Sequence, residues 1–124
     1  MIIEFQADEV EVGPATGAVI NAGFYTEGNY LSFQRMIDEE LGNRLRIPTD
    51  THYAARDDQS YGEYGVLEKV VLSRTTIEVT ANETGKEIMQ CDGVKVGFDV
   101  DNEKFANLRE RLGQIFGEIL TVVE

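Results

Sequence analysis

Short runs of alternating apolar and polar residues, separated by turn residues, fill most of this 124-residue sequence and constrain its fold to a sheet. Around Ile3 to Ala7 and around Ile77 to Ala81 every second residue is apolar, which is typical of a strand buried on one face. Val66 to Leu72 is denser in apolar residues and is expected to enter a core. The pair Asp92-Gly93 favours positive φ and predicts a two-residue hairpin. The strands predicted in this way cover residues 3–7, 10–12, 18–24, 52–56, 66–72, 77–81, 87–90, 94–98 and 119–123.

Two structures compete between residues 30 and 45. Leu31 and Phe33 would share one face of a strand, and an acidic turn would follow it. The same segment also carries apolar residues at helical spacing, and Ser32 would cap such a helix. We favour a strand over residues 29–35 followed by the acidic turn, and the helix stays open as the alternative. The helical set consists of Phe33, Met36, Ile37, Leu41 and Leu45.

The remaining segments complete the predicted fold. Residues 57–65 are acidic and rich in glycine and tyrosine, a composition typical of a surface loop. Near the C-terminus, Asp101 or Asn102 is expected to cap an amphipathic helix. Strands joined by hairpins and followed by one helix predict a single α+β domain over residues 1–124, with a mainly antiparallel β-sheet and one C-terminal amphipathic helix packed on it. The apolar stripe of that helix consists of Phe105, Leu108, Leu112, Ile115 and Phe116.

The charge of the chain restricts its partners. Twenty-three carboxylates against eleven lysines and arginines give a net charge of −12. Direct binding to nucleic acid or to an anionic membrane requires a basic face, so both are disfavoured. A basic protein partner, metal ions, or solubility alone would each fit the charge. No apolar run approaches the roughly 18 residues of a membrane span, and the N-terminus lacks the pattern of a signal peptide, so we expect a cytoplasmic protein.

Motifs for catalysis or cofactor binding are absent from the sequence. His52 is the one histidine, and no serine has the spacing of a nucleophile with its base. Cys91 is alone, so it can form neither an internal disulfide nor a thiolate metal cluster. Residues 99–103 resemble a calcium loop, but Lys104 stands where such a loop requires glycine, and helix capping explains the carboxylates better. We therefore expect no enzyme, no cofactor and no metal site.

Two acidic segments are the best candidates for binding a partner. Residues 38–40 carry three carboxylates in succession, and residues 57–68 carry four with no cation and with two tyrosines interleaved. Tyrosine offers a large contact area at low entropic cost and is enriched in binding hot spots. A plain loop, in which Gly62 and Gly65 serve only the turn, explains the second segment equally well. The candidate contact residues are Asp38, Glu39, Glu40, Asp57, Asp58, Tyr61, Glu63 and Tyr64.

Several of these segments also carry a family resemblance. The strand Tyr30–Arg35, the segment Asp57–Gly65 and the strand Leu67–Arg74 carry most of it, and Val96–Asp99 and Leu108-Arg109 continue the pattern. On these residues the chain resembles immunity protein family ten of bacterial polymorphic toxin systems, over about residues 18 to 116. The resemblance implies a cytoplasmic, mostly β protein that binds and neutralises a toxin encoded beside it, without a catalytic centre. It assigns no contact residue.

The charge adds a hypothesis about the toxin, and other functions remain open. Many antibacterial toxins act on nucleic acid and are basic, so an acidic inhibitor would match a basic toxin such as a nuclease. The alternative is a small-ligand-binding or regulatory domain with a pocket between sheet and helix, in which residues 119–123 would form a homodimer edge. An enzyme that uses Asp58, His52 and a tyrosine ranks last.

Overall fold

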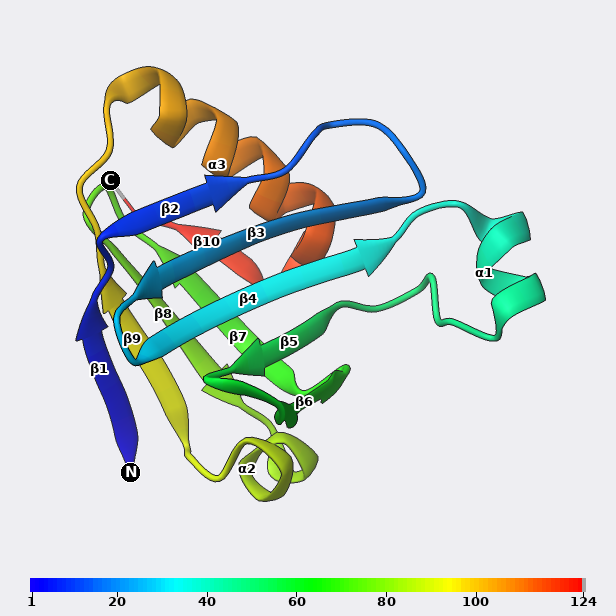
Figure 1. Ribbon diagram of the computed structural model, residues 1–124, viewed down its shortest axis with the longest axis horizontal. Coiled ribbons are helices and arrows are strands. Elements are labelled where there is room, and N and C mark those ends of the chain that lie inside the picture. The colour runs from blue at the N-terminus through cyan, green and yellow to red at the C-terminus, as the bar shows by residue number, and fades with distance from the viewer. Residues whose placement is uncertain (124) are drawn as a thin grey trace.

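The computed structural model describes residues 1–123, which fold into two five-stranded sheets and three α-helices (Figure 1). One sheet has the strand order β1-β9-β8-β7-β10 and the other has the order β2-β3-β4-β5-β6. Neighbouring strands are antiparallel except for β1 with β9 and β7 with β10, which are parallel. The predicted α+β class with a mainly antiparallel sheet is confirmed. The elements are β1 (Ile2–Gln6), β2 (Glu9–Val12), β3 (Val19–Thr26), β4 (Asn29–Met36), α1 (Glu39–Leu45), β5 (Tyr53–Arg56), β6 (Asp58–Tyr64), β7 (Leu67–Leu72), β8 (Thr76–Ala81), α2 (Glu83–Met89), β9 (Gly93–Gly97), α3 (Asn102–Phe116), a 3-10 turn (Gly117–Ile119) and β10 (Leu120–Val122).

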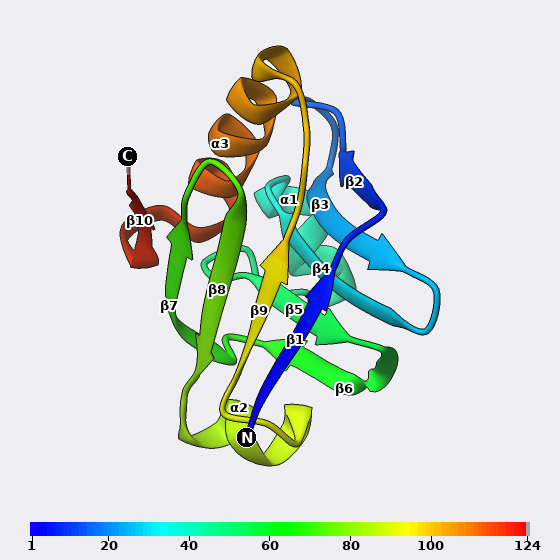
Figure 2. The ribbon, with the colours of Figure 1, turned by 90° about the vertical axis from the view of Figure 1, so that its left-hand side faces the viewer.

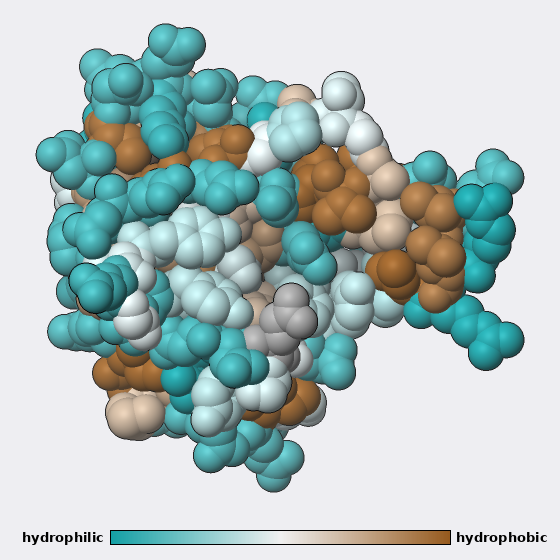
Figure 3. Space-filling view, viewed as in Figure 1, coloured by the Kyte–Doolittle hydropathy of each residue, from teal (hydrophilic) through white to brown (hydrophobic). Residues whose placement is uncertain are grey.

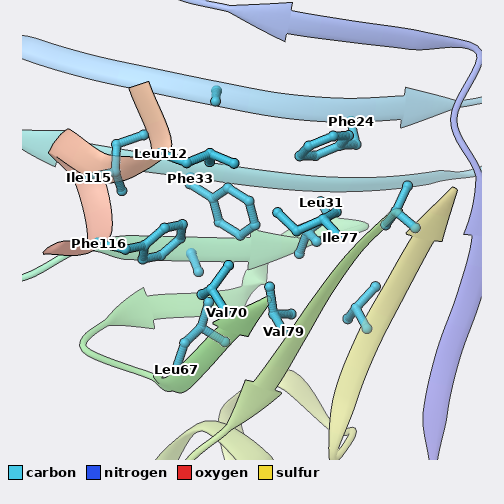
Figure 4. Close-up of a cluster of buried hydrophobic side chains, with 14 of the residues drawn as sticks. Phe24, Leu31, Phe33, Leu67, Val70, Ile77, Val79, Leu112, Ile115 and Phe116 are labelled. Carbon is cyan, nitrogen blue, oxygen red and sulfur yellow. The ribbon is translucent and has the colours of Figure 1, made fainter. Parts of the chain in front are cut away.

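One hydrophobic core joins both sheets and α3. Figure 2 shows how these elements are arranged. Helix α3 packs on β2, β3 and β4 on one side and on β10 on the other. Aromatic rings run through the core, since the ring of Phe33 lies 6.3 Å from that of Phe24 and 4.8 Å from that of Phe116 between ring centroids. Figure 4 shows these rings between the strands of the two sheets and the end of α3. The inner faces of both sheets are therefore covered.

The C-terminal helix was predicted correctly. Asp101 is the N-cap, and its carboxylate accepts a hydrogen bond of 2.8 Å from the backbone N–H of Lys104. Four residues of the predicted stripe are buried, and Phe105 is half-buried beside them. The chain then ends in β10, at the edge of its sheet, where an edge strand was expected. The buried stripe residues are Leu108, Leu112, Ile115 and Phe116.

The prediction of a loop at residues 57–65 is wrong, because most of this segment forms β6. Asp57 adopts a left-handed backbone with φ of 60°, which aspartate tolerates better than most residues, and it turns the chain between β5 and β6. Strand β6 then pairs with β5, and Gly65, with φ of 65°, ends it. Because β6 is the edge strand of its sheet, it needs few apolar residues, and its composition is that of a loop.

Two short helices replace the other predicted turns and hairpins. The strand at residues 29–35 is confirmed as β4, but the acidic turn after it is wrong, because Asp38 caps α1 there. The strand predicted at residues 87–90 is also wrong. Asn82 caps α2 by accepting a hydrogen bond from the N–H of Gly85, and α2 connects β8 to β9 in place of a hairpin at Asp92-Gly93. Both helices have seven residues, which is too short for an apolar period to show in the sequence.

Candidate protein-binding surface

The outer face of the sheet β2 to β6 is crossed by a row of small residues. Gly23, Ser32, Ala55 and Gly62 are successive partners across β3, β4, β5 and β6. Their neighbours along the strands, among them Phe24 and Phe33, point the other way into the core, as alternation in a strand requires. The four small residues therefore lie on the side away from α3 and from the second sheet. This is the face that Figures 1 and 3 present to the viewer.

Four tyrosines lie on both sides of this row. Tyr25 and Tyr30 are direct cross-strand partners on β3 and β4, with ring centroids 6.0 Å apart. Tyr53 and Tyr64 are partners on β5 and β6, with ring centroids 5.1 Å apart. All four side chains are half-buried. We call the surface formed by these four tyrosines and the four small residues the tyrosine face.

Two glycines allow the tyrosine rings to lie over the sheet. A Cβ atom on Gly23 would lie 2.4 Å from the hydroxyl oxygen of Tyr25, and one on Gly62 would lie 2.8 Å from that of Tyr53. Both distances are far below van der Waals contact, so a larger residue would push the rings away from the strands. The rings in turn cover the small residues, since Gly23 and Ala55 are buried although they lie on the outer face. The result is a surface whose side chains are held in place by packing.

Carboxylates border the tyrosine face and act on its hydroxyl groups. Burial raises the pKa of Tyr25, and the charges of Glu11 and Glu9 on the neighbouring strand raise it further. Burial and the charge of Asp58 likewise raise the pKa of Tyr30, and burial and Glu63 raise that of Tyr53. These hydroxyl groups therefore stay protonated at neutral pH and can donate hydrogen bonds.

Neither arginine of the sheet β2 to β6 lies on this face, because both are engaged elsewhere. Arg35 donates to the carbonyl oxygens of Thr49 and Ile115, at 3.2 and 3.3 Å, and so reaches the end of α3. The Nε atom of Arg56 donates to the carbonyl oxygen of Met89, at 2.6 Å, at the end of α2. The strands β2 to β6 contain no other lysine or arginine. The strands of the tyrosine face therefore contribute carboxylates to its border and no cation, while Lys104 and Arg111 of α3 lie at the hollow beyond Glu9 and Glu11.

Comparison with known protein families supplies the identity. The family model described as Immunity protein 10 matches residues 4–106 of the 124. The chain belongs to this family. The match runs from β1 into the first turns of α3, so it includes all strands of the tyrosine face. Neither the curated proteins nor the solved structures yield a match.

Membership in the Immunity protein 10 family makes the chain an immunity protein of toxin systems, and its partner is a toxin. It also indicates an inhibitor rather than an enzyme. Among the helices of the described residues, none is long and apolar enough to cross a membrane.

The hairpin of β5 and β6 brings together five of the predicted contact residues of this immunity protein. Tyr64 is part of the tyrosine face, and Asp58 and Glu63 act on its tyrosines through their charge. Asp57 has structural contacts, because it accepts a hydrogen bond from the N–H of Tyr30 at 2.8 Å and pairs with Arg56 at 3.0 Å. Tyr61 lies under the guanidinium group of Arg56, 4.5 Å from ring centroid to Cζ.

The other predicted group lies apart from these residues. Asp38 caps α1 through a hydrogen bond of 2.9 Å from the N–H of Leu41, and Glu39 and Glu40 are exposed in the first turn. Figure 1 shows α1 projecting beyond the ends of β4 and β5, away from β6. The structure therefore does not join the two acidic segments into one site.

Sequence reasoning missed most of the tyrosine face. Tyr25, Tyr30 and Tyr53 were not among the candidates, and neither were Glu9 and Glu11 on β2. Each tyrosine stands next to a buried strand residue, which indicates an outward side chain. Only the register between four strands places them together, and no single segment contains that information.

The groups with catalytic potential are engaged in the core. His52 is 5% exposed, and its Nε2 atom accepts a hydrogen bond of 3.1 Å from the N–H of Leu67. Burial and the nearby charge of Arg35 lower the pKa of His52 to about 4, so it is neutral at physiological pH. Cys91 is buried, and burial raises the pKa of its thiol. The described residues contain no group of three or more His, Cys, Asp or Glu side chains that could hold a metal ion.

The alternative of a small-ligand site gains little support from the hollows of the surface. One hollow of about 560 Å³ lies between β2 and α3 and is open to solvent. Its lining includes Glu11, Glu103 and Lys104, which are charged, whereas small-molecule sites are mostly apolar and enclosed. The guanidinium of Arg111, at the same place, already donates to the carbonyl oxygen of Gly13 at 2.8 Å.

Proposed function

We propose that this immunity protein binds a basic surface of its cognate toxin and neutralises the toxin by covering that surface, without a cofactor. A toxin that acts on nucleic acid, such as a nuclease, fits best, because a phosphate-binding site must carry lysine and arginine. Such a toxin acts in the cytoplasm, so we place the immunity protein there as well. The observation that carries the proposal is the charge distribution: a tyrosine face bordered by carboxylates, from which both arginines of the sheet are withdrawn.

The net charge of −12 supports the same proposal through kinetics. Oppositely charged proteins associate faster than neutral ones, by about 10- to 1,000-fold, because the field steers their encounter. Fast capture matters for an inhibitor that must bind its toxin before the toxin finds a substrate. A basic toxin would meet an attractive field on approach to this chain.

Co-expression with the toxin encoded beside its gene tests the function. Cells that produce the toxin domain alone should stop growing, and cells that also produce the immunity protein should grow. The two purified proteins should form a one-to-one complex on size-exclusion chromatography. Growth arrest that persists in the presence of the immunity protein, together with no complex, would contradict the function.

Stopped-flow kinetics at two ionic strengths tests the charge of the toxin. The association rate constant should fall at least about tenfold between 10 and 150 mM NaCl, since the Debye length shortens from about 30 to about 8 Å over this range. The dissociation rate constant should change much less. A complex whose association is insensitive to salt would leave the immunity function intact and refute the basic toxin.

A further inference from the structure

The tyrosine face is an unusual outer surface for a sheet. An antiparallel sheet with one face on the core normally exposes polar and charged side chains on the other face. Here four of the five tyrosines of the chain gather on that outer face, around a row of small residues. None of the three helices covers them, because α1 projects from the end of the sheet, α2 packs on β6 and β8, and α3 packs on the core side (Figures 1 and 2).

The side chains of this face are already ordered before any partner binds. The hydroxyl of Tyr25 lies over Gly23, the hydroxyl of Tyr53 lies over Gly62, and each ring has a second ring as a cross-strand neighbour. A free side chain loses about 0.5–1.5 kcal/mol of entropy when an interface immobilises it. Rings that are fixed by packing avoid most of this loss, and tyrosine has few torsions to lose.

The charge around the face determines the kind of partner that fits. Glu9 and Glu11 on β2 are the cross-strand partners of Tyr25 and Gly23 and so lie on the face itself. At the other border, Glu63 alternates with Gly62 and Tyr64 on the edge strand β6, and Asp58 and Glu63 act on the tyrosines through their charge. The described residues of β2 to β6 place no cation between these carboxylates, so an acidic partner would be repelled. Lysine and arginine side chains would find carboxylates at the borders and tyrosine rings between them, and a cation over a tyrosine ring contributes about 0.5–2 kcal/mol.

The acidic segment on α1 fits such a partner less well. Glu39 and Glu40 share their seven-residue helix with Arg44, and Arg46 follows it directly. This part of the surface therefore has mixed charge, and it offers no tyrosine. The two carboxylates have the same type and exposure as Glu9 and Glu11, which makes them a matched control.

We propose that the tyrosine face is the surface on which the toxin docks, and that the toxin presents lysine and arginine side chains to it. This inference rests on the proposed function and adds the place of contact. The tyrosine rings form the centre of the interface, and the carboxylates of β2 and β6 form its charged border. Helix α1 lies outside the interface.

Charge reversal tests the proposal with the toxin domain encoded beside the gene, after the wild-type complex has been established. The double variant Glu9→Lys with Glu11→Lys should weaken the complex by about 100-fold or more, because cations of the partner then meet cations. The control variant Glu39→Lys with Glu40→Lys changes the net charge by the same amount and should weaken it less than about fivefold. Equal losses in both variants, or a larger loss in the α1 variant, would overturn the docking surface.

Hydroxyl-radical footprinting of the wild-type complex gives a test that needs no variant. Toxin binding should protect Tyr25, Tyr30, Tyr53 and Tyr64 from oxidation, and Tyr61, on the other side of the hairpin under Arg56, should stay as reactive as in the free protein. If the wild-type protein neutralises the toxin but the four tyrosines remain unprotected, the function holds and the docking surface is wrong. If the wild-type protein does not bind the toxin at all, the proposed function itself fails.

Discussion

At the scale of single residues, His52 is the group whose charge state matters most for the fold. Its ring is buried against that of Phe116, with centroids 5.1 Å apart, and Nε2 must be unprotonated to accept the hydrogen bond from Leu67. Protonation would break this hydrogen bond and place a cation near Arg35. The same contacts that bury His52 therefore make it a source of acid sensitivity.

The pH dependence of stability should contain a contribution from this residue. The pKa of His52 is about 4 in the folded protein and about 6.5 when unfolded, so only the unfolded chain binds the proton between these values. The contribution is constant above pH 6.5, and stability is lost as the pH falls through the window toward 4. We expect the free energy of unfolding to fall about 2 kcal/mol more in the wild type than in His52→Gln between pH 7 and 4.5, measured by urea denaturation.

The glutamine variant keeps an acceptor for the N–H of Leu67 and does not titrate. The carboxylates that also titrate below pH 5 contribute equally to the free energy of unfolding of both proteins, so their effect cancels in the comparison. If the free energy of unfolding falls equally with pH in the two proteins, protonation of His52 does not destabilise the folded state, contrary to what its burial predicts.

At the scale of elements, two helical glycines should respond to alanine in opposite directions. A Cβ atom on Gly113 in α3 meets nothing within 4 Å, so Gly113→Ala should stabilise the fold by about 0.5–1 kcal/mol through helix propensity alone. A Cβ atom on Gly85 in α2 would lie 2.1 Å from the carbonyl oxygen of Val66. Gly85→Ala should therefore destabilise by about 1–3 kcal/mol, as overpacking does, although its propensity is equally improved.

Urea denaturation of both variants measures the difference directly. The carbonyl oxygen of Val66 also accepts a hydrogen bond of 2.9 Å from the N–H of Asn82, so it cannot withdraw without loss of a second contact. A Gly85→Ala variant that is stabilised as Gly113→Ala is would indicate that α2 is not packed against Val66, directly before β7.

Helices α1 and α2 also show which secondary-structure elements could not be predicted from the sequence. Strand β8 and the helix α3 were recognisable because their apolar residues repeat over several periods, whereas the pattern at β4 also fitted a helix. Helices α1 and α2 have seven residues each, and their signals were single capping residues, Asp38 and Asn82. Strand β6 has the composition of a loop, and its pairing with β5 makes it a strand.

The tyrosine face was even harder to predict from the sequence than these elements. Tyr64 was predicted from its own acidic segment, whereas Tyr25, Tyr30 and Tyr53 stand on three other strands. Their assembly depends on register, and on the division of the strands into two sheets with two parallel pairs. These are long-range choices, decided by which faces can be buried together and not by any local pattern.

At the scale of the whole molecule, the net charge of −12 destabilises the folded state of the free protein. Like charges repel one another more strongly in the compact state than in the extended chain, so screening should favour folding. We expect the melting temperature to rise by roughly 4 °C between 10 and 150 mM NaCl, equivalent to about 1 kcal/mol for a domain of this size. The isosteric variant Glu39→Gln with Glu40→Gln should have a higher melting temperature than the wild type at low salt, and its melting temperature should rise less with added salt. Thermal unfolding followed by circular dichroism measures both.

Salt should therefore act on this protein with opposite signs before and after the partner is added. Screening stabilises the free fold because it weakens repulsion among the carboxylates, and it slows association with a basic toxin because it weakens attraction. If slower association at high salt arose instead from partial unfolding, the melting temperature would fall over the same range. A rising melting temperature together with a falling association rate constant thus assigns the kinetic effect to electrostatic attraction. A melting temperature that falls with salt would contradict both the self-repulsion and this assignment.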